Sequence, residues 1–480
     1  MTPAQRQLVE TIRDRFGPRS VVTDPAEIEP WLIDWRRRFH GDTPAMLAPD
    51  STEAVAAIVG LAAGLRVPLV PQGGNTGMVG GAVPPGDGSA LLLSLRRLDR
   101  LRRIDADLAV AEAGVVLHTL HAAAHAIGRR FPLDLGARGS ATIGGLVSTN
   151  AGGVQVLRFG TMRSLVAGVE AVLPDGSIHD GLAALRKDNR GYSLDQLLIG
   201  AEGTLGVVTA AALRLVPAAV ARGVAWVGVD SPARALALLR ALETQTPTIE
   251  SFEILPDIAL RDVLAHIPGT RAPLAGAWPW HVLIESVATD PAAEPPADLL
   301  ARLLAPAIAD ATLGDGVVAA SEAQAEAFWR IRHSVSEAER AAGPAVQHDI
   351  AVPVADMPRF LVDAAAAIEA RFPGTRAIAY GHLGDGNVHF HVRAPAGVAR
   401  DAWLAGDARA ITRAVHDLVV AAAGTISAEH GIGQMKRDEL ARVLPPARLA
   451  AMRSIKAALD PYAILNPEKL LALAPGRATP

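Results

Sequence analysis

The chain has 480 residues, of which 50% are hydrophobic and 20% charged, and its formal net charge at pH 7 is −4. This composition supplies a large hydrophobic core for two or three domains and argues against a dedicated nucleic-acid binder. The sequence contains no cysteine, which excludes disulfides, thiolate metal ligands and cysteinyl-flavin links. No apolar run reaches the ~20 residues of a membrane span and no signal-peptide pattern opens the chain, so we expect a cytoplasmic protein.

The first part of the chain alternates apolar segments with turns. Its spacing predicts helices over residues 1–17 and 51–65, a strand over 67–70 that ends at Pro71, a hairpin over 167–178 and a strand over 205–216. Pro217 follows the last of these, and we place a domain boundary there.

Three glycine-rich loops lie within this part, at residues 71–81, 134–153 and 199–208. The first lacks the G-x-G-x-x-G spacing, and Pro84-Pro85 disfavours a helix directly after it, which argues against a nicotinamide dinucleotide fold. Successive backbone N–H groups in such loops can bind an anion. A single glycine-rich loop is more often a tight turn, but three together favour a long phosphate-bearing cofactor.

Beyond residue 217 the pattern alternates between helix and strand, which predicts an α+β domain. We expect a strand over residues 280–286 and another over 388–392, with helices over 233–242, 298–305, 322–342, 354–372, 402–423 and 447–459.

A cluster of histidines is the strongest chemical signal in the chain. His382 precedes the turn Asp385-Gly386-Asn387, and His389 lies in the alternating segment after it, so a returning strand would bring the two imidazoles together. Glu429 and His430 occur in a small, glycine-rich stretch. Two His and one Glu form an open zinc site, and His430 would then be a neighbouring base. Each histidine taken singly is more often a core or surface residue, so spacing alone leaves metal binding and a structural role both open.

Six motifs in this order resemble those of the FAD-dependent D-2-hydroxy acid dehydrogenases, flavoproteins of the vanillyl-alcohol-oxidase type. The motifs are PQGGNTGMVGG, DLGARGSATIGGLVSTNAGG, RKDNRGYSLDQLLIGAEGTLGVVT, GHLGDGNVHFHV, SAEHGIGQMK and LDPYAILNPEKLL. The match runs from about Trp31 to the end of the chain. It is specific for the family but not for the substrate.

The resemblance implies an α+β protein with a two-lobed FAD-binding domain over residues 1–217, whose core is about 40–217. It further implies an α+β substrate domain with an antiparallel sheet over 218–425, and a C-terminal segment, 426–480, that returns to the flavin. The implied activity is oxidation of a D-2-hydroxy acid, D-2-hydroxyglutarate or D-lactate, to the 2-oxo acid by hydride transfer to flavin N5.

The resemblance also assigns residues to the cofactor. Neither Asn75 nor Thr76 is the His or Cys that links flavin covalently in some relatives, so FAD should be held non-covalently. The implied FAD-binding residues are Gly73, Gly74, Asn75, Thr76, Gly77, Met78, Gly114, Leu135, Thr142, Gly144, Gly145, Asn150, Gly152, Gly153, Val208 and Asn466.

The same comparison assigns the reaction site. His382, His389 and Glu429 match the metal ligands of the family and His430 matches its catalytic base. Substrate binding falls to Arg330, Ser334, Gln347 and Asn387. Arg330 would bind a carboxylate through its planar fork, although a helix-surface ion pair is the alternative. Gln347 stands where many relatives have a lysine, so a dicarboxylate is expected to bind less well here.

Several alternatives remain open at this point. They are a glycolate-oxidase-type subunit, a metal-dependent hydrolase, a non-redox FAD enzyme like alkyl-dihydroxyacetonephosphate synthase, and a non-catalytic flavin subunit. Zn²⁺ suits the ligand set, but Mn²⁺, Fe²⁺ and Co²⁺ tolerate it too. The electron acceptor, a protein or a quinone, is not fixed by the sequence. Nor is the oligomeric state, for which we consider a homodimer.

Overall fold

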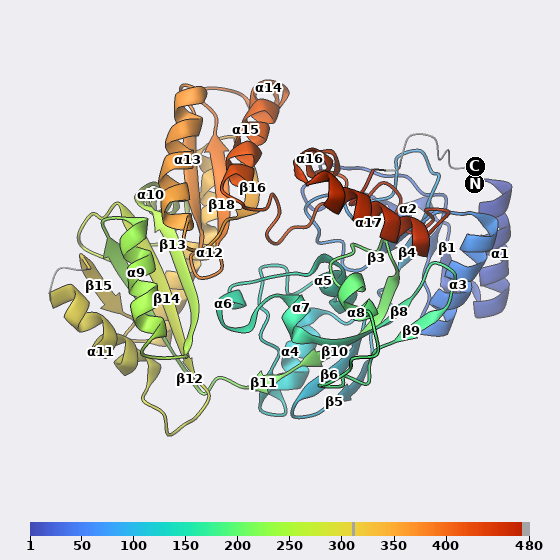
Figure 1. Cartoon of the computed structure of the whole chain (residues 1–480), viewed down its shortest axis with the longest axis horizontal. Helices are drawn as coiled ribbons and strands as arrows, with labels where there is room; N and C mark the ends of the chain where they lie inside the picture. Colours follow the sequence, from blue (N-terminus) through green and yellow to red (C-terminus); the bar gives the residue numbers. More distant parts are fainter. Residues whose placement is uncertain (310–312, 473–480) are drawn as a thin grey trace. The chain divides into compact units, whose positions relative to one another are not determined.

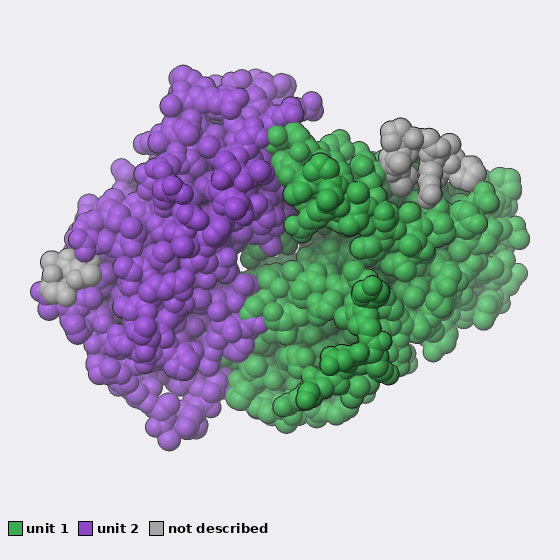
Figure 2. Space-filling view, in the orientation of Figure 1, with its two compact units in different colours: residues 1–153, 160–217, 429–480 green, residues 154–159, 218–428 purple. Residues whose placement is uncertain are grey.

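The structure, a computed structural model, describes residues 1–309 and 313–472. The chain forms two compact units (Figure 2). Unit 1 contains residues 1–153, 160–217 and 429–480, and unit 2 contains residues 154–159 and 218–428. The C-terminal segment is therefore part of unit 1, although it follows the whole of unit 2 in the sequence.

The first lobe of unit 1 is a four-stranded sheet in the order β1 (Val21–Val22), β2 (Met46–Leu47), β4 (Leu91–Ser94) and β3 (Leu69–Gln72). Helices α1 (Pro3–Phe16) and α3 (Thr52–Leu65) pack on it through Leu8, Ile12 and Ile58, which are fully buried. Both helices were predicted, and Ser51 caps α3 by accepting from the Ala54 N–H. The prediction that the strand ends at Pro71 is wrong, because β3 continues to Gln72. β3 is the edge strand of this sheet, where a proline is tolerated because its missing N–H needs no partner.

The second lobe is a five-stranded antiparallel sheet in the order β5 (Leu101–Ile104), β6 (Leu108–Glu112), β10 (Val207–Arg214), β8 (Val166–Val172) and β9 (Ile178–Asp180). The predicted hairpin is confirmed as β8 and β9, with Val172 paired to Ile178. Helices α4 (Leu117–His125) and α5 (Ile143–Thr149) and the two-stranded ribbon of β7 (Arg129–Arg130) and β11 (Val216–Pro217) complete the lobe. The C-terminal segment returns to unit 1, where Leu465 bridges to Leu69 of β3.

Unit 2 is built on one seven-stranded sheet in which every pair of neighbours is antiparallel. The strand order is β15 (Asp315–Val318), β12 (Ala221–Val229), β14 (Trp280–Ala288), β13 (Ile249–Pro256), β17 (Arg376–His382), β18 (Asn387–Arg393) and β16 (Ala345–Ala351). The strands predicted at β14 and β18 are confirmed.

Helices cover both faces of this sheet (Figure 1). One face carries α10 (Asp257–His266) and α12 (Glu322–Ala342), packed on Trp226 and Tyr380. The other face carries α9 (Pro232–Glu243), α11 (Pro296–Ala309), α13 (Met357–Arg371) and α15 (Ala408–Ala421), packed on Phe252 and Phe390. The single helix predicted over 402–423 is wrong, because α14 (Arg400–Ala405) ends at Gly406 before α15 begins.

Shorter elements fill the remaining connections: η1 (Pro18–Ser20), α2 (Pro25–Ile28), η2 (Glu29–Trp31), α6 (Val156–Phe159), α7 (Met162–Leu165), α8 (Leu194–Leu198), α16 (Arg437–Val443) and α17 (Pro446–Leu459). No helix in the described part of the chain has the length and hydropathy needed to cross a bilayer.

Candidate functional site

The three glycine-rich loops contact one another within unit 1. A Cβ atom added to Gly73 would overlap the Thr142 hydroxyl, and one added to Gly74 would overlap the Ser140 carbonyl oxygen, so the first loop lies directly against the second. The third loop is joined to the second by backbone hydrogen bonds, in which Glu202 N–H donates to the Ser148 carbonyl at 2.8 Å. Glycine is needed where two loop backbones approach this closely.

Buried polar atoms without a protein partner lie along these loops. They are Gln72 Oε1, Asp134 Oδ1, Thr142 Oγ1 and Asn466 Oδ1. The side-chain amide of Asn466 donates to the carbonyls of Gly81 at 2.9 Å and Glu202 at 2.7 Å, which ties the C-terminal segment to the first and third loops. A buried polar atom costs free energy unless something bonds to it. The loops therefore fit a ligand with many polar groups, as a dinucleotide has.

The remaining residues predicted to bind FAD lie in or beside these loops. Asn75 and Asn150 adopt positive φ angles of 52° and 50°, which Asn tolerates better than most residues. Gly144 and Gly153 allow close approach to Ala113 and to the Asp134 carbonyl. Gly114 follows β6 and Val208 lies in β10, while Thr76, Gly77, Met78, Leu135, Gly145 and Gly152 lie on the loops or at the start of α5.

The predicted pair of histidines meets on unit 2. The turn between β17 and β18 forms as expected, with Gly386 at φ 83° and the Asp385 carboxylate accepting the Asn387 N–H at 2.9 Å. Because the side chains of alternate strand residues share a face, Asn387, His389 and His391 of β18 all lie on the face that α12 covers. The rings of His382 and His389 are 5.5 Å apart, centroid to centroid.

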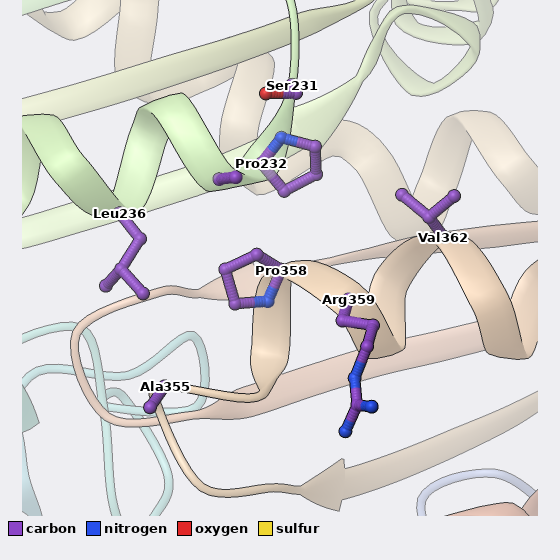
Figure 3. A pocket seen from close by; sticks show the side chains of 8 residues that line it. Ser231, Pro232, Leu236, Ala355, Pro358, Arg359 and Val362 are labelled. Carbon is purple, nitrogen blue, oxygen red and sulfur yellow. The ribbon is translucent and has the colours of Figure 1, made fainter.

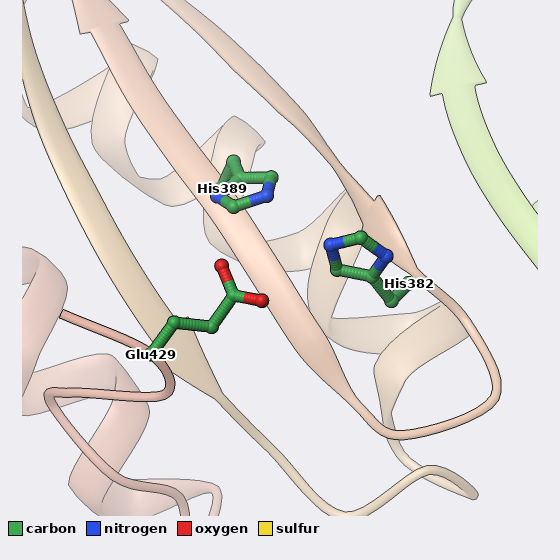
Figure 4. A group of neighbouring side chains, drawn as sticks. All are labelled: His382, His389 and Glu429. Carbon is green, nitrogen blue, oxygen red and sulfur yellow. The ribbon is translucent and has the colours of Figure 1, made fainter. Parts of the chain in front are cut away.

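Glu429 completes a possible ligand group with these two imidazoles. One ligand atom of each of the three side chains lies within 4.8 Å of the others (Figure 4). Glu429 directly follows the 218–428 segment in the chain, and His430 comes next. The donor set of two imidazoles and one carboxylate suits a divalent cation. The assignment of these three residues as metal ligands stays a prediction.

A buried ion pair lies beside His382. Its Nδ1 is 2.6 Å from Oε1 of Glu253, and Arg332 Nε donates to Oε2 of Glu253 at 2.7 Å. Burial opposes the imidazolium form, but the Glu253 carboxylate outweighs it and raises the pKa of His382 to about 9. Burial likewise opposes the carboxylate, but Arg332 and His382 lower the pKa of Glu253 to about 2. The pKa of His389 is lowered well below its usual value, first by burial and then by Arg332.

The predicted substrate-binding residues are placed in two different surroundings. Asn387 donates to Asp349 Oδ1 and to the Ile350 carbonyl, each at 2.9 Å, so its amide holds the carboxylate that pairs across the strands with His389. Gln347 donates to Glu339 Oε2 at 3.3 Å, and the same oxygen contacts Nδ1 of His391. Both residues belong to the face of the sheet that contains the metal group.

Arg330 and Ser334 instead line an open hollow of about 910 Å³ between α12 and residues 269–273. Arg330 is exposed and donates to the Pro268 carbonyl at 2.8 Å. The arginine of α12 that pairs with Glu253, the partner of His382, is Arg332, two positions further on. Sequence reasoning missed it, although the helical period groups it with the buried Phe328 and Val335. Glu253 was also missed; its signal is a carboxylate between the apolar residues Phe252 and Ile254 of a buried strand.

A second hollow of about 370 Å³ lies between α9 and α13 (Figure 3). Its lining is mostly apolar, with Pro232, Leu236 and Val362, and its one charged side chain, Arg359, pairs with Asp356. This hollow offers no group suited to acid–base or metal chemistry.

Within unit 1, Glu202 supports the stretch that follows His430. Its carboxylate accepts the N–H groups of Ile432 at 2.8 Å and Gly433 at 2.7 Å. Burial raises the pKa of Glu202 despite these bonds. The third glycine-rich loop and the stretch that carries Glu429 and His430 are therefore joined at one side chain.

Glu202→Gln is expected to lower kcat/KM by roughly tenfold. The glutamine amide keeps one accepting oxygen but places an NH₂ donor where the second backbone N–H needs an acceptor, which costs about 1–3 kcal/mol. The flavin content should stay at the wild-type level, since the backbone carbonyl of Glu202 that binds Asn466 remains. Flavin absorbance per protein and steady-state kinetics measure both effects. Glu10→Gln, at an exposed position on α1, is the control. Wild-type kinetics in Glu202→Gln would contradict this role.

Comparison with protein-family models identifies the class. The model for an FAD binding domain matches residues 43–181, and the model for the C-terminal domain of FAD linked oxidases matches residues 219–470. The chain belongs to the FAD-linked oxidases and is an FAD-linked oxidoreductase.

The chain is similar to D-2-hydroxyglutarate dehydrogenases along most of its length. It is 36% identical over 463 residues to the mitochondrial enzyme of Bos taurus, covering 95% of this chain and 82% of that protein. It is 37% identical over 451 residues to the enzyme of Xanthomonas citri pv. viticola, covering 93% of each. The predicted family is confirmed. Because the bovine protein is named as mitochondrial, the cytoplasmic location stays a prediction.

Solved structures of other flavoenzymes share the fold. p-Cresol methylhydroxylase matches with a TM-score of 0.75 at 15% identity, over 98% of this chain and 97% of that one. Alkyldihydroxyacetonephosphate synthase matches with a TM-score of 0.70 at 16% identity, over 97% and 85%. These similarities confirm the predicted α+β architecture of the vanillyl-alcohol-oxidase type, and at such identities they concern the fold alone.

Proposed function

We propose that this protein oxidises a D-2-hydroxy acid to the 2-oxo acid with non-covalent FAD and a divalent metal. The single observation behind the metal is the convergence of His382, His389 and Glu429. The substrate class follows the names of the relatives, which are D-2-hydroxyglutarate dehydrogenases. Residues 1–217 would form the cofactor domain, 218–425 the substrate domain and 426–480 the segment that completes both sites.

FAD would be held by the three glycine-rich loops, where the unpartnered oxygens of Gln72, Thr142 and Asn466 fit a polar ligand. When bound, it supplies an acceptor at N5 for the hydride from the substrate α-carbon. The metal, for which Zn²⁺ is the proposed occupant, supplies Lewis acidity that lowers the pKa of the substrate hydroxyl.

His430 would act as the base. Its position next to Glu429 in the chain puts an imidazole beside a metal ligand, and histidine exchanges protons in the neutral pH range. A ring nitrogen of His430 would accept the hydroxyl proton while the α-carbon loses its hydride. Proton and hydride together account for the two-electron oxidation of the alcohol to the ketone.

Recognition of the substrate carboxylate is proposed for Arg330 and Ser334. These residues are four apart on α12 and line the same hollow. Arg330 donates from Nη2 to the Pro268 carbonyl, and its guanidinium has further N–H groups that can bind a carboxylate. Asn387 would orient the substrate, either through its unpartnered Oδ1 or through Asp349. The reduced flavin would pass its electrons to a protein or a quinone, and a homodimer is proposed.

Gln347→Lys is expected to raise the ratio of kcat/KM for D-2-hydroxyglutarate over D-lactate by roughly tenfold, because a charge-assisted bond to the second carboxylate replaces a neutral one. Glu339 lies 3.3 Å from the Gln347 amide and will neutralise part of the new charge, so a larger gain is not expected. Gln347→Met keeps the side-chain length without charge and serves as the control. An unchanged ratio in the lysine variant would refute the assignment of Gln347.

The proposed function is tested by an anaerobic substrate screen of the flavin-loaded protein. D-lactate, D-2-hydroxyglutarate, glycolate, D-malate and D-mandelate are mixed with it, and loss of flavin absorbance is followed. At least one D-2-hydroxy acid should bleach the flavin, and its L-enantiomer should not. Absence of bleaching with every acid would favour a non-redox flavoenzyme, such as the alkyldihydroxyacetonephosphate synthase type, over the proposal.

A further inference from the structure

Lys469 is a buried cation in the C-terminal segment of unit 1. It is only 3% exposed, although lysine is almost never buried without a charged partner. Its ammonium group forms no hydrogen bond or ion pair with any residue of 1–309 or 313–472. The charged groups that act on it are Glu468 and Arg437, which pair with each other at 3.3 Å and have opposite effects on the lysine.

The contrast with Lys456, a second buried lysine of the same segment, shows what Lys469 lacks. Lys456 Nζ bonds to the Asp460 carboxylate at 2.5 Å and to the carbonyls of Thr204 at 2.7 Å and Leu465 at 2.9 Å. Burial lowers the pKa of Lys469 to about 8, which still leaves most of it protonated near pH 7. Because a buried charge is costly without a partner, Lys469 fits a bound anion.

The backbone on both sides of Lys469 has an unusual conformation. Asn466, Glu468 and Leu470 have φ angles of 44°, 61° and 63°, in the left-handed region that residues other than glycine rarely adopt. Such residues persist only where the surrounding structure imposes them, and they gather at ligand sites. The segment therefore holds Lys469 in a fixed place at the expense of a less favourable backbone.

Two contacts locate Lys469 within unit 1. Three residues before it, the Asn466 amide donates to the carbonyl of Gly81 in the first glycine-rich loop at 2.9 Å. One residue after it, the Leu470 N–H donates to the carbonyl of Gly433 at 3.0 Å, in the stretch that follows the proposed base. Of the parts of FAD, the flavin ring belongs beside that base, because it takes the hydride from the substrate. Lys469 is therefore assigned to the flavin end of the cofactor site rather than to the pyrophosphate.

Reduction gives the flavin ring the charge that a lysine suits. A hydride brings two electrons and one proton, so the reduced ring carries one negative charge until it takes a further proton from solvent. A charged protein group near N1 or N5 is one of the means by which proteins tune a flavin. A fixed cation stabilises the charge that develops on reduction more than it stabilises the neutral oxidised ring.

We propose that Lys469 supplies a positive charge beside N1 of the flavin ring and so raises the reduction potential of the bound FAD. The lysine acts on the cofactor and not on the metal or the substrate. This inference rests on the FAD site of the proposed function and is independent of the metal centre.

The test is the reduction potential of bound FAD, measured anaerobically by equilibration with redox dyes and without substrate. Lys469→Met removes the charge at similar side-chain length. It should lower the equilibrium constant for reduction by about tenfold or more, a fall of about 30 mV for each tenfold in a two-electron couple. The spectrum of the reduced flavin at pH 7 should shift towards the neutral form. Lys469→Arg keeps the charge and should retain most of the wild-type potential.

Lys456→Met is the matched control, because it removes a buried lysine of the same segment whose charge is already paired with Asp460. It should lower thermal stability and leave the potential unchanged. Lys469→Gln, neutral but polar, gives the same test if methionine is not tolerated by the fold. A wild-type potential in both neutral variants, or an equal fall in Lys456→Met, would overturn the inference.

Failure of the proposed function is distinguishable from these results. The dye titration needs neither substrate nor metal, so a protein that oxidises no D-2-hydroxy acid would contradict the proposed function and leave the measured effect of Lys469 in place. An active wild-type enzyme with the same potential as its neutral Lys469 variants would contradict the inference alone.

Discussion

His389→Ala is expected to lower kcat/KM for D-2-hydroxy acids by roughly 10³-fold and to reduce bound metal to background. The reason is that the imidazole is one of the three proposed protein ligands, and loss of the Lewis acid would remove several kcal/mol of stabilisation from the developing alkoxide. The flavin should remain, because the loops assigned to FAD belong to unit 1 and His389 belongs to unit 2. Metal analysis, flavin absorbance and kinetics with an artificial acceptor measure the three quantities separately.

His348→Ala provides the control for this variant. His348 is also a buried histidine of the same sheet, but its Nδ1 bonds to the Phe390 carbonyl and its ring packs against His416. Its replacement should lower stability while leaving metal content near one per chain. If His389→Ala kept its metal and more than about a tenth of its activity, His389 would not be a ligand.

His430→Asn is the second large effect that we expect. Loss of a general base lowers rates by roughly 10²–10⁴-fold, and the fall should appear in kcat as well as in kcat/KM. Bound metal and FAD should both stay at wild-type levels, which separates this variant from His389→Ala. The rate of flavin bleaching in a single anaerobic turnover is the appropriate measurement, because it excludes the later transfer of electrons to an acceptor.

The contrast between the two histidines also separates two mechanisms. If His430→Asn lost its metal along with its activity, His430 would be acting as a ligand, and the base would have to be found elsewhere. A variant that reacts within a factor of about ten of the wild-type rate would rule out His430 as the base.

Local patterns in the sequence predicted those parts of the fold that local interactions decide. The helix over residues 51–65, the hairpin of β8 and β9 and the limits of α12 were all predicted from short-range signals, and the structure confirms them. β16 was missed, because its residues Gln347–Ile350 show too little alternation of apolar and polar side chains to be distinguished from a loop. Its position at the edge of the sheet depends on pairing with β18, which lies some forty residues away.

The candidate site likewise contains some contacts that local sequence patterns predict and others that they do not. His382 and His389 are joined by a tight turn, so their meeting could be predicted from the sequence between them. The contact of His382 with Glu253 joins residues 129 positions apart, and only the packing of β13 against β17 creates it. Arg330 was chosen by resemblance, whereas the buried side of α12 carries Arg332, which pairs with Glu253. Patterns in the sequence did not reveal which distant strands pair or which side of a helix is buried.

The central claim, that oxidation of the hydroxy acid needs a metal held by His382, His389 and Glu429, is tested most directly by metal depletion. The protein is treated with a chelator under conditions that retain FAD and is mixed anaerobically with the best substrate from the screen. Flavin absorbance should then stay constant, and bleaching should begin when stoichiometric Zn²⁺ or Mn²⁺ is added. Bleaching of the metal-free protein at the full rate would contradict the account.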